Sequence, residues 1–450
     1  MARFFGTDGI RGIANRPPIA PETFMALGHI VVQLLGASTP EAQPVFVVGY
    51  DTRLSSPMLA AALTAGLCSA GANVLQVGIM PTPGVAYLTR YTRATGGLVI
   101  SASHNSYEDN GLKIFSGLGT KLHDELEELI EARLDQPGLS QGPTGEAVGR
   151  PIPYEEGSRH YSTFLKDLYR ANTHSGLRVG LDCAHGAASF LAPALFEHLG
   201  CQVYAWQIAP DGRNINHQCG AVHPSFIQRK VLEHRLDIGF AFDGDADRLV
   251  AVDHTGTILD GDDILAICAR AFLQPTPTDR CTVVSTVMAN LGLEHALRHM
   301  GITLHRTPVG DRHVVQGMQQ TGAVLGGEQS GHIVFGDHHT TGDGMLTAIQ
   351  LLHIVVSQKL PLAALAMSMH KYPQRIVNVP VRVRQDPLSF PAIRQVIEEA
   401  GHTLGDDGRV VVRLSGTENV VRIMVEAPEL PIVDCLSQNI TQAITQVLGA

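Results

Sequence analysis

The sequence predicts a multidomain α/β protein that ends in a smaller α+β unit. Short β-branched runs alternate with amphipathic helical stretches over most of the chain, which is the pattern of layered α/β domains. After about residue 370 the pattern changes, because strands there are no longer each followed by a helix. At about 100–200 residues per domain, a length of 450 residues fits two to four domains.

The first predicted domain spans residues 1–152. We expect strands at 45–49, 73–78, 97–101 and 112–115, and helices at 57–70, 82–93 and 123–134. Residues 135–153 are rich in Gly, Pro, Ser and Gln, a composition typical of a linker. This stretch therefore marks the end of the first domain.

Two more α/β segments are predicted at 153–255 and 256–370, and a last unit at 371–450. In the second segment we expect strands at 177–182, 202–206 and 237–242, and helices at 189–199 and 224–234. The third should have strands at 282–286, 303–307 and 323–326, and helices at 262–273, 291–300, 312–320 and 344–357. The last should have strands at 376–383, 409–414 and 420–426, and helices at 392–400 and 433–448.

Composition and charge narrow the class of protein. A net charge of −10 argues against a nucleic-acid surface, which needs clustered Lys and Arg. The seven cysteines form no CxxC pair, so neither a zinc ribbon nor a disulfide framework is indicated. Residues 54–89 carry no charge, but Pro, Gly and polar residues interrupt them, so no run of about 20 apolar residues spans a membrane. We therefore expect a cytoplasmic enzyme with neither a nucleic-acid nor a membrane partner.

An acidic loop follows the predicted strand at 237–242. It reads Asp243-Gly-Asp-Ala-Asp-Arg248, and ligands bind at strand ends in open α/β sheets. Two carboxylates about 4 Å apart repel by about 4 kcal/mol at an effective dielectric near 20, and Mg²⁺ or Ca²⁺ would relieve that repulsion. An EF-hand is excluded, because the sixth position counted from Asp243 is Arg248 rather than Gly. The alternative interpretation is a solvated acidic turn.

A second polar loop, Ile100-Ser-Ala-Ser-His-Asn105, follows an apolar strand. A serine at a strand end is exposed and positioned, and Lys113 and Arg11 are groups that transfer protons or stabilise charge near Ser103. The loop is not G-x-S-x-G, so an acyl-transfer elbow is not supported. A plain polar turn is the alternative.

Two glycine-containing loops complete the set of candidates. In the segment 326–332, which reads GGEQSGH, the side chains of Glu328, Ser330 and His332 are suited to binding sugar hydroxyls or moving a proton. In Arg413-Leu-Ser-Gly-Thr-Glu418, an Arg, two hydroxyls and backbone N–H groups are suited to holding a phosphate. A structural turn is the alternative for each loop. Neither a P-loop nor a G-x-G-x-x-G motif occurs, so a P-loop kinase and a dinucleotide fold are not supported.

Together with the opening segment Phe5–Gly12, these four loops resemble, in order and spacing, the motifs of the α-D-phosphohexomutase superfamily. The resemblance covers nearly the whole chain, and Phe5–Gly12 and 326–332 look most like the bacterial members that act on glucosamine phosphates. It implies a phosphosugar mutase, which is an isomerase. It also implies three mixed-sheet α/β domains and a fourth, TATA-binding-protein-like domain around a central cleft.

The resemblance also implies roles for individual residues. Ser103 would be phosphorylated, and one Mg²⁺ per subunit would be bound by Ser103, Asp243, Asp245 and Asp247. The residues near the transferring phosphate would be Arg11, Lys113 and Arg248. Glu328 and Ser330 would read the sugar. The loop for the non-reacting phosphate would contain Arg413, Ser415, Gly416, Thr417 and Arg422.

The implied reaction is a two-step relay. Phospho-Ser103 donates to the 1-hydroxyl of glucosamine 6-phosphate, the glucosamine 1,6-bisphosphate reorients, and its 6-phosphate returns to Ser103. Lys113 or His332 would serve as general base and acid. An activating kinase or the bisphosphate, acting as primer, would first phosphorylate Ser103. The product, glucosamine 1-phosphate, would feed amino-sugar nucleotide and cell-wall precursor synthesis, and a homodimer is one option for the assembly.

The chain departs from the superfamily pattern at Ser106, Leu414 and Asn419, where Pro is frequent. These changes remove no charge or hydroxyl named above, but they leave the choice of sugar open. A mutase of phosphomannose or phosphoglucose with the same mechanism is the first alternative. An aspartyl-phosphate phosphatase with Asp243 as nucleophile and a non-enzymatic sugar-phosphate sensor are the others.

Overall fold

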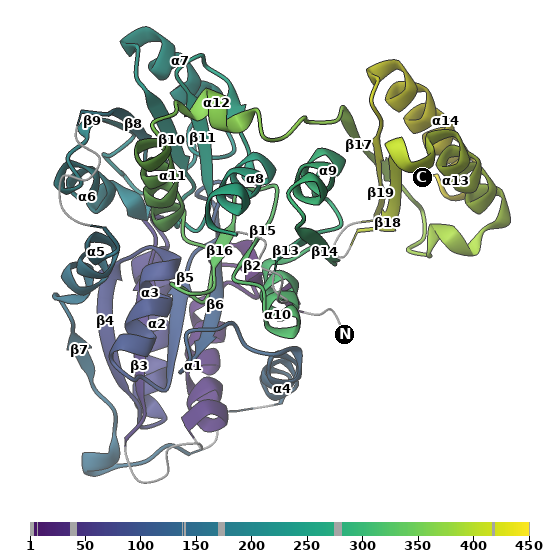
Figure 1. The fold of residues 1–450 in the computed structure, drawn as a ribbon. Helices are drawn as coiled ribbons and strands as arrows, with labels where there is room; N and C mark the ends of the chain where they lie inside the picture. Colours follow the sequence, from purple (N-terminus) through teal and green to yellow (C-terminus); the bar gives the residue numbers. More distant parts are fainter. Residues whose placement is uncertain are drawn as a thin grey trace.

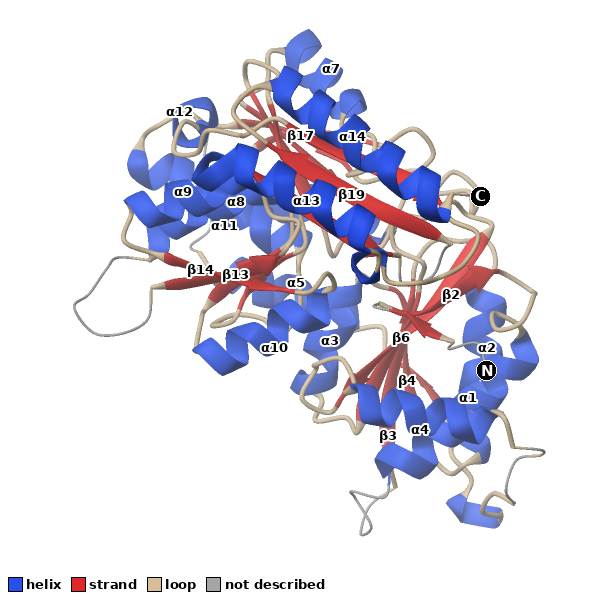
Figure 2. Cartoon of the chain, turned by 90° about the vertical axis from the view of Figure 1, so that its right-hand side faces the viewer, coloured by secondary structure: helices blue, strands red, loops and turns tan. Residues whose placement is uncertain are grey.

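Four β-sheets follow one another along the chain, each flanked by helices (Figures 1 and 2). The computed structural model describes residues 4–6, 8–36, 43–136, 138, 141–169, 176–273, 281–415 and 419–449. In this part of the chain the first three sheets mix parallel and antiparallel strands, and the fourth is wholly antiparallel. The predicted fold class, three consecutive mixed-sheet α/β domains followed by an α+β domain, is confirmed.

The first sheet has the strand order β1-β2-β6-β5-β3-β4-β7, in which β5, β3, β4 and β7 run parallel. Its strands are β1 (Phe5–Gly6), β2 (Gly9–Ile13), β3 (Val45–Tyr50), β4 (Asn73–Ile79), β5 (Gly96–Ile100), β6 (Asp109–Ser116) and β7 (Pro151–Pro153). Its helices are α1 (Pro21–Leu35), α2 (Ser56–Ser69), α3 (Thr82–Tyr91) and α4 (Asp124–Leu134). Because β5 is buried along its whole length inside the sheet, the loop after it is anchored at a fixed edge.

Parts of this first unit differ from the sequence-based expectation. The stretch 135–153 is not only a linker, since it contains the 3₁₀ turn η2 (Gly145–Ala147) and β7, which pairs with β4. Pro151 and Pro153 have no N–H to donate, so this short strand is confined to the sheet edge and lacks an alternating pattern. The sequence also did not predict α1, because its buried residues 27–32 are consecutive and hide the helical period.

The second sheet, β12-β11-β10-β8-β9, and the third, β14-β13-β15-β16, are parallel on one side and antiparallel on the other. Their strands are β8 (Arg178–Asp182), β9 (Gln202–Trp206), β10 (Ile238–Phe242), β11 (Leu249–Asp253), β12 (Ile258–Leu259), β13 (Thr282–Thr286), β14 (Thr303–Thr307), β15 (Leu325–Gly327) and β16 (Ile333–Phe335). Their helices are α5 (Gly157–Asp167), η3 (Ala187–Phe190), α6 (Ala192–His198), α7 (Ser225–His234), α8 (Gly261–Phe272), α9 (Leu291–His299), α10 (Asp311–Thr321), α11 (Gly344–Gln358) and α12 (Leu362–Ala366). The acidic loop 243–248 is therefore the turn that joins β10 to its antiparallel neighbour β11.

The fourth sheet, β17-β19-β18, is packed against two helices that lie across it (Figure 2). Its elements are β17 (Gln374–Pro380), η4 (Pro387–Ser389), α13 (Pro391–Leu404), η5 (Gly405–Asp407), β18 (Arg409–Leu414), β19 (Val420–Glu426) and α14 (Leu430–Leu448). The antiparallel register of β18 and β19 places Arg413 directly opposite Arg422. The register therefore places two guanidinium groups side by side on neighbouring strands.

The first three sheets share one apolar core, whereas the fourth has a core of its own. Val99, Phe240 and Val283, one from each of the three sheets, belong to the same buried cluster. The fourth unit meets the third through polar contacts such as that from Arg409 Nη2 to the carbonyl oxygen of Ala289, at 2.7 Å. Among the described residues, none of the helices combines the length and the apolar character that crossing a membrane requires.

A buried histidine joins the third unit to the first. His339 follows β16, and its Nε2–H donates to the carbonyl oxygen of Pro83, in the first turn of α3, at 3.0 Å. Its Nδ1 accepts the N–H of Thr340 at 2.8 Å, which requires the neutral ring. Burial lowers the pKa of His339 to about 4.

We expect acid to weaken this junction. Because the ordinary pKa is 6.5, the unfolded chain binds the proton first as the pH falls, so the contribution of His339 is complete above pH 6.5 and is lost toward pH 4. At about pH 5 the loss amounts to about 2 kcal/mol in the free energy of unfolding. Urea unfolding at about pH 7.5 and about pH 5 should show a smaller acid-induced loss for His339→Gln than for the wild type.

The control for this experiment is His338→Gln, at an exposed neighbouring position. It should lose as much stability in acid as the wild type does. Equal losses in all three proteins would contradict the role given to His339.

Candidate active site

Two loops from different sheets meet at the carboxyl ends of their strands. Ser103 follows β5, Asp243 follows β10, and the Ser103 hydroxyl donates to Asp243 Oδ2 at 2.6 Å. Both side chains are fully buried, so the expectation of an exposed serine at this strand end was wrong. Gly244 permits this approach, because a Cβ there would lie 2.6 Å from the carbonyl oxygen of Ser103. The fold thus joins two groups that are 140 positions apart in the sequence.

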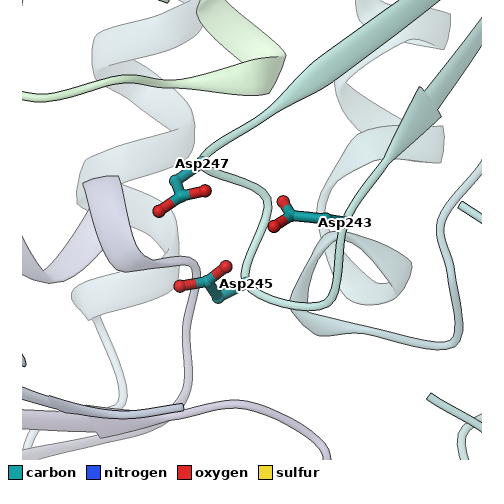
Figure 3. Close-up of side chains that lie close together, drawn as sticks. All are labelled: Asp243, Asp245 and Asp247. Carbon is teal, nitrogen blue, oxygen red and sulfur yellow. The ribbon is translucent and has the colours of Figure 1, made fainter. Parts of the chain in front are cut away.

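Three aspartates of one turn point toward a common centre (Figure 3). Asp243, Asp245 and Asp247 are buried, and one oxygen of each lies within 4.8 Å of the others. In the described part of the chain, Asp245 Oδ1 and Asp247 Oδ1 accept no hydrogen bond. Burial and the charges of Asp247 and Asp245 raise the pKa of Asp243 well above its ordinary value. Clustered carboxylate oxygens with unused acceptor capacity suit a hard cation, so these residues fit a metal-ion site.

Positive charge from the first unit surrounds these carboxylates. Lys113, on β6, places its Nζ 2.9 Å from Asp245 Oδ2 and 2.8 Å from Asp247 Oδ2. Burial opposes the ammonium, but the two aspartates raise the pKa of Lys113 well above its ordinary value, so it is charged. Thr82, the first residue of α3, donates its N–H to the backbone oxygen of Asp245 and its hydroxyl to the carboxylate. The positive end of a helix therefore faces the acidic turn.

Three other predicted residues border the same centre. Arg11, on β2, donates to Asn105 Oδ1 at 3.4 Å. Arg248 Nε lies 3.8 Å from Asp247 Oδ1, and His332 Nδ1 lies 3.7 Å from Asp247 Oδ2. Burial opposes the imidazolium, but Asp247 raises the pKa of His332 above its ordinary value. The acidic centre is therefore bordered by the guanidinium groups of Arg11 and Arg248 and by the ring of His332, whose Nε2 accepts the N–H of Gly342 at 3.0 Å.

A cavity of about 400 Å³ lies beside this centre, between elements of the second, third and fourth sheets. Its lining includes five of the predicted residues, namely Arg248, Glu328, Ser330, Arg413 and Arg422. Arg248 also borders Asp247, so it connects the cavity with the acidic turn. A larger cavity, of about 690 Å³, lies at the amino ends of β8 and β10, and none of the predicted site residues lines it.

Two guanidinium groups face each other at the cavity. Arg413 and Arg422 are cross-strand partners, and like charges opposite one another cost stability in a sheet. Burial and the charge of Arg422 lower the pKa of Arg413. An anion bound here would relieve that repulsion, so the pair suits a phosphate. Ser415 is buried just beyond β18, whereas the predicted Gly416 and Thr417 lie outside the described residues.

The sequence did not single out several residues of this centre. Asp8 lies within the segment Phe5–Gly12, and it forms ion pairs with Arg11, Lys113 and Lys121. Arg53 lies three positions after β3, and its partner Asp51, a charge placed directly after an apolar strand, is the signal that would have found the pair. Thr82 gave no such signal, because its partner is 163 positions away in the sequence.

Family models match the chain in succession. Alpha/beta/alpha domains I, II and III of phosphoglucomutase/phosphomannomutase match residues 2–140, 159–256 and 260–372, and the C-terminal domain matches 376–442. The fold and the site therefore define a phosphosugar mutase, an isomerase, and the chain belongs to the phosphoglucomutase/phosphomannomutase family.

Full-length relatives narrow this assignment. The chain is 45% identical over 449 residues to the phosphoglucosamine mutase of Brevibacillus brevis, with 100% of each chain covered. It is 44% identical over 457 residues to the phosphoglucosamine mutase of Anaeromyxobacter dehalogenans, with 99% of each covered. Within the family, the chain belongs with the phosphoglucosamine mutases.

Solved structures share the fold. A phosphoglucomutase/phosphomannomutase family protein from Burkholderia thailandensis superposes with a TM-score of 0.83 at 25% identity, covering 99% of this chain and 97% of that one. The N-acetylphosphoglucosamine mutase of Aspergillus fumigatus, in complex with GlcNAc-6P and magnesium, superposes with a TM-score of 0.68 at 17% identity, covering 98% and 95%. The second likeness concerns the fold alone.

We expect Lys113→Met to make stability depend on a divalent cation. Removing the ammonium leaves Asp245 and Asp247 buried without it, which costs about 3 kcal/mol. A cation held by the aspartates would offset part of that loss. Thermal unfolding in EDTA and in excess Mg²⁺ should show a larger cation-induced rise in Tm than for the wild type.

Lys230→Met is the matched control, because it removes a lysine that pairs with Glu233 and lies over the ring of Trp206, outside the acidic centre. Its response to the cation should equal that of the wild type. An equal rise in both variants would show that Lys113 does not compete with the cation, and no rise in either would show that the aspartates do not hold one.

Proposed function

We propose that this chain interconverts glucosamine 6-phosphate and glucosamine 1-phosphate with phosphorylated Ser103 as the phosphoryl carrier. The observation that carries the proposal is the 2.6 Å contact of the Ser103 hydroxyl with Asp243, because it sets a nucleophilic oxygen beside a cation site. Phospho-Ser103 gives its phosphoryl group to the 1-hydroxyl, and the 1,6-bisphosphate reorients. Its 6-phosphate then returns to Ser103. A bisphosphate primer or an activating kinase first phosphorylates Ser103.

One Mg²⁺ is the proposed occupant of the acidic turn. It would be held by Ser103, Asp243, Asp245 and Asp247. When bound, Mg²⁺ neutralises phosphate charge beside the carboxylates. Support comes from the oxygen-only donor set and from the magnesium in the Aspergillus fumigatus complex. A phosphate on Ser103 adds about −1.5 to −2 charge at pH 7, which Lys113 alone does not balance.

The remaining cationic residues neutralise charge and handle protons in this proposal. Arg11, Arg248 and Lys113 face the transferring phosphate. Lys113 and His332 are the two candidates for general acid and base, and Asp247 raises the pKa of each. Lys113 is charged and carries a proton that it can return to the Ser103 oxygen when the phosphoryl group leaves, whereas His332 accepts the N–H of Gly342 at Nε2 and can donate only from Nδ1.

The 400 Å³ cavity is the proposed sugar site. Glu328 and Ser330 bind sugar hydroxyls. The non-reacting phosphate is held by Arg413, Ser415, Gly416, Thr417 and Arg422. Support comes from Arg248, which lines the cavity and also borders Asp247, so that a ligand there reaches the acidic turn. A cytoplasmic location and a homodimer stay predictions.

We expect Ser103→Ala to lower turnover of glucosamine 6-phosphate by about 10³-fold or more, because the carrier oxygen is lost. Isomerisation is assayed with Mg²⁺ and a glucose or glucosamine 1,6-bisphosphate primer. Mass spectrometry of the peptide that contains residue 103 should find phosphate in the wild type and none in the variant. Ser106→Ala, an exposed serine of the same loop, is the control and should stay active.

Each competing function has its own outcome in this experiment. Phosphate on Asp243 instead of Ser103 would identify an aspartyl-phosphate phosphatase. Tight sugar-phosphate binding without isomerisation would identify a sensor. Faster turnover of mannose or glucose phosphates than of glucosamine 6-phosphate would identify a mutase for another sugar.

We expect Arg413→Met to weaken binding of the non-reacting phosphate. The loss of a charge-assisted contact should raise KM for glucosamine 6-phosphate by about 10- to 100-fold, with a smaller effect on kcat. Steady-state kinetics measure both constants. Arg382→Met, at an exposed position of the same unit, is the control. An unchanged KM in Arg413→Met would place the non-reacting phosphate elsewhere.

A further inference from the structure

A fully buried arginine holds the loop that carries Ser103. Arg53 is 1% exposed, and its Nε donates to Asp51 Oδ2 at 2.8 Å. Its two terminal nitrogens donate to four backbone oxygens, three in the loop and one at the start of β6, those of Ser103 (2.9 Å), Asn105 (3.0 Å), Ser106 and Asp109 (3.0 Å). A planar guanidinium has its donors in fixed directions, so it fixes these oxygens relative to one another.

The same network reaches the amide of Ser103. The Ser101 hydroxyl donates to Asp51 Oδ2 at 2.7 Å and accepts the N–H of Ser103 at 2.9 Å. Both backbone polar groups of Ser103 are therefore held by buried side chains. This matters because Ser103 has a φ of +52°, a left-handed conformation that costs a non-glycine residue about 1–3 kcal/mol. The contacts of Arg53 and Ser101 with the backbone of Ser103 stabilise this left-handed conformation.

A second donor approaches the loop from the other domain. Asn216, between β9 and α7, donates through Nδ2 to the oxygen of Ser103 at 2.9 Å and to that of Asn105 at 3.0 Å. These are two of the oxygens that Arg53 engages. Asn216 is 5% exposed and belongs to the unit that also carries Asp243. The Ser103 loop is thus held by Arg53 from the first unit and by Asn216 from the second.

We propose that Arg53 and Asn216 form a clamp that fixes the Ser103 oxygen relative to Asp243 during phosphoryl transfer. Both are positioning residues, because they act on the backbone of the loop and not on the phosphate. The inference rests on the proposed function of Ser103. Phosphorylation adds about −1.5 to −2 charge next to the acidic turn and pushes the loop outward, and the clamp opposes that displacement. A shift of about 1 Å in a reacting atom can cost about 100-fold in rate.

Asn216→Asp is the most direct test. Asp keeps the shape of Asn and tolerates the φ of +58°, but it turns acceptor oxygens toward two carbonyl oxygens. We expect kcat to fall by about 10- to 100-fold while KM for glucosamine 6-phosphate stays within about twofold. Gln218→Glu is the matched control, because it makes the same amide-to-acid change at an exposed position of the same segment.

Two more variants keep the test decisive. Arg53→Lys retains the charge but cannot engage four oxygens, so it should lower kcat in the same way. If Asn216→Asp does not fold, Asn216→Gly removes the donors and suits the positive φ.

The outcomes separate the clamp from the function on which it rests. Wild-type kcat in a folded Asn216 variant, with phosphate on Ser103, overturns the clamp and leaves the phosphoserine mechanism intact. A raised KM with unchanged kcat also overturns it. An active wild type without phosphate on Ser103 overturns the mechanism and the clamp together.

Discussion

The structure depends on the burial of three carboxylates beside a serine hydroxyl. Out of water, Asp243, Asp245 and Asp247 repel one another strongly unless opposite charge lies close by. That charge comes from a different domain, through Lys113 on β6 and the positive end of α3. The acidic turn is therefore stable only while the first two units stay packed together, and the apolar core that they share with the third unit keeps them so.

The first three units share one apolar core, whereas the fourth is packed separately, and this difference matches two requirements of the reaction. Phosphoryl transfer requires the serine and the acidic turn to be placed within a fraction of an ångström, and a continuous core resists displacement. The arginine pair of the fourth sheet sits on a unit with a separate core that meets its neighbour through polar contacts. In the proposed mechanism this unit has to release and rebind the reorienting bisphosphate, and a separately packed unit permits such movement. The boundary between the first two units is therefore rigid, whereas the boundary between the third and fourth units permits movement.

Local pattern predicted most of the fold, because alternating strands and helices of ordinary length carry their own periodicity. Two of the elements that it missed lack this signal, because β7 contains two prolines and the buried face of α1 is too wide to show a period. It also missed α5 and β11, although α5 buries Tyr161 and Leu165 at helical spacing and β11 is a short buried apolar run. The acidic turn was predictable, since adjacent carboxylates after an apolar strand are a local feature. Its partners Thr82 and Lys113 were not derivable from spacing, because each lies more than 100 positions away, and only folding creates those contacts.

Charge also separates the two phosphate positions of the reaction. The chain has a net charge of −10, yet the cavity presents Arg248, Arg413 and Arg422, so an anionic sugar phosphate is drawn there. The aspartates of the acidic turn repel the same anion until positive charge neutralises them. In the proposed mechanism, the approach of phosphate to Ser103 therefore depends on a cation at the turn, whereas binding of the distal phosphate by the arginine pair does not. In that mechanism the reorienting bisphosphate exchanges its two ends between the acidic turn and the arginine pair. Because these two sites differ in charge, we expect each phosphate to bind with a different affinity in each place.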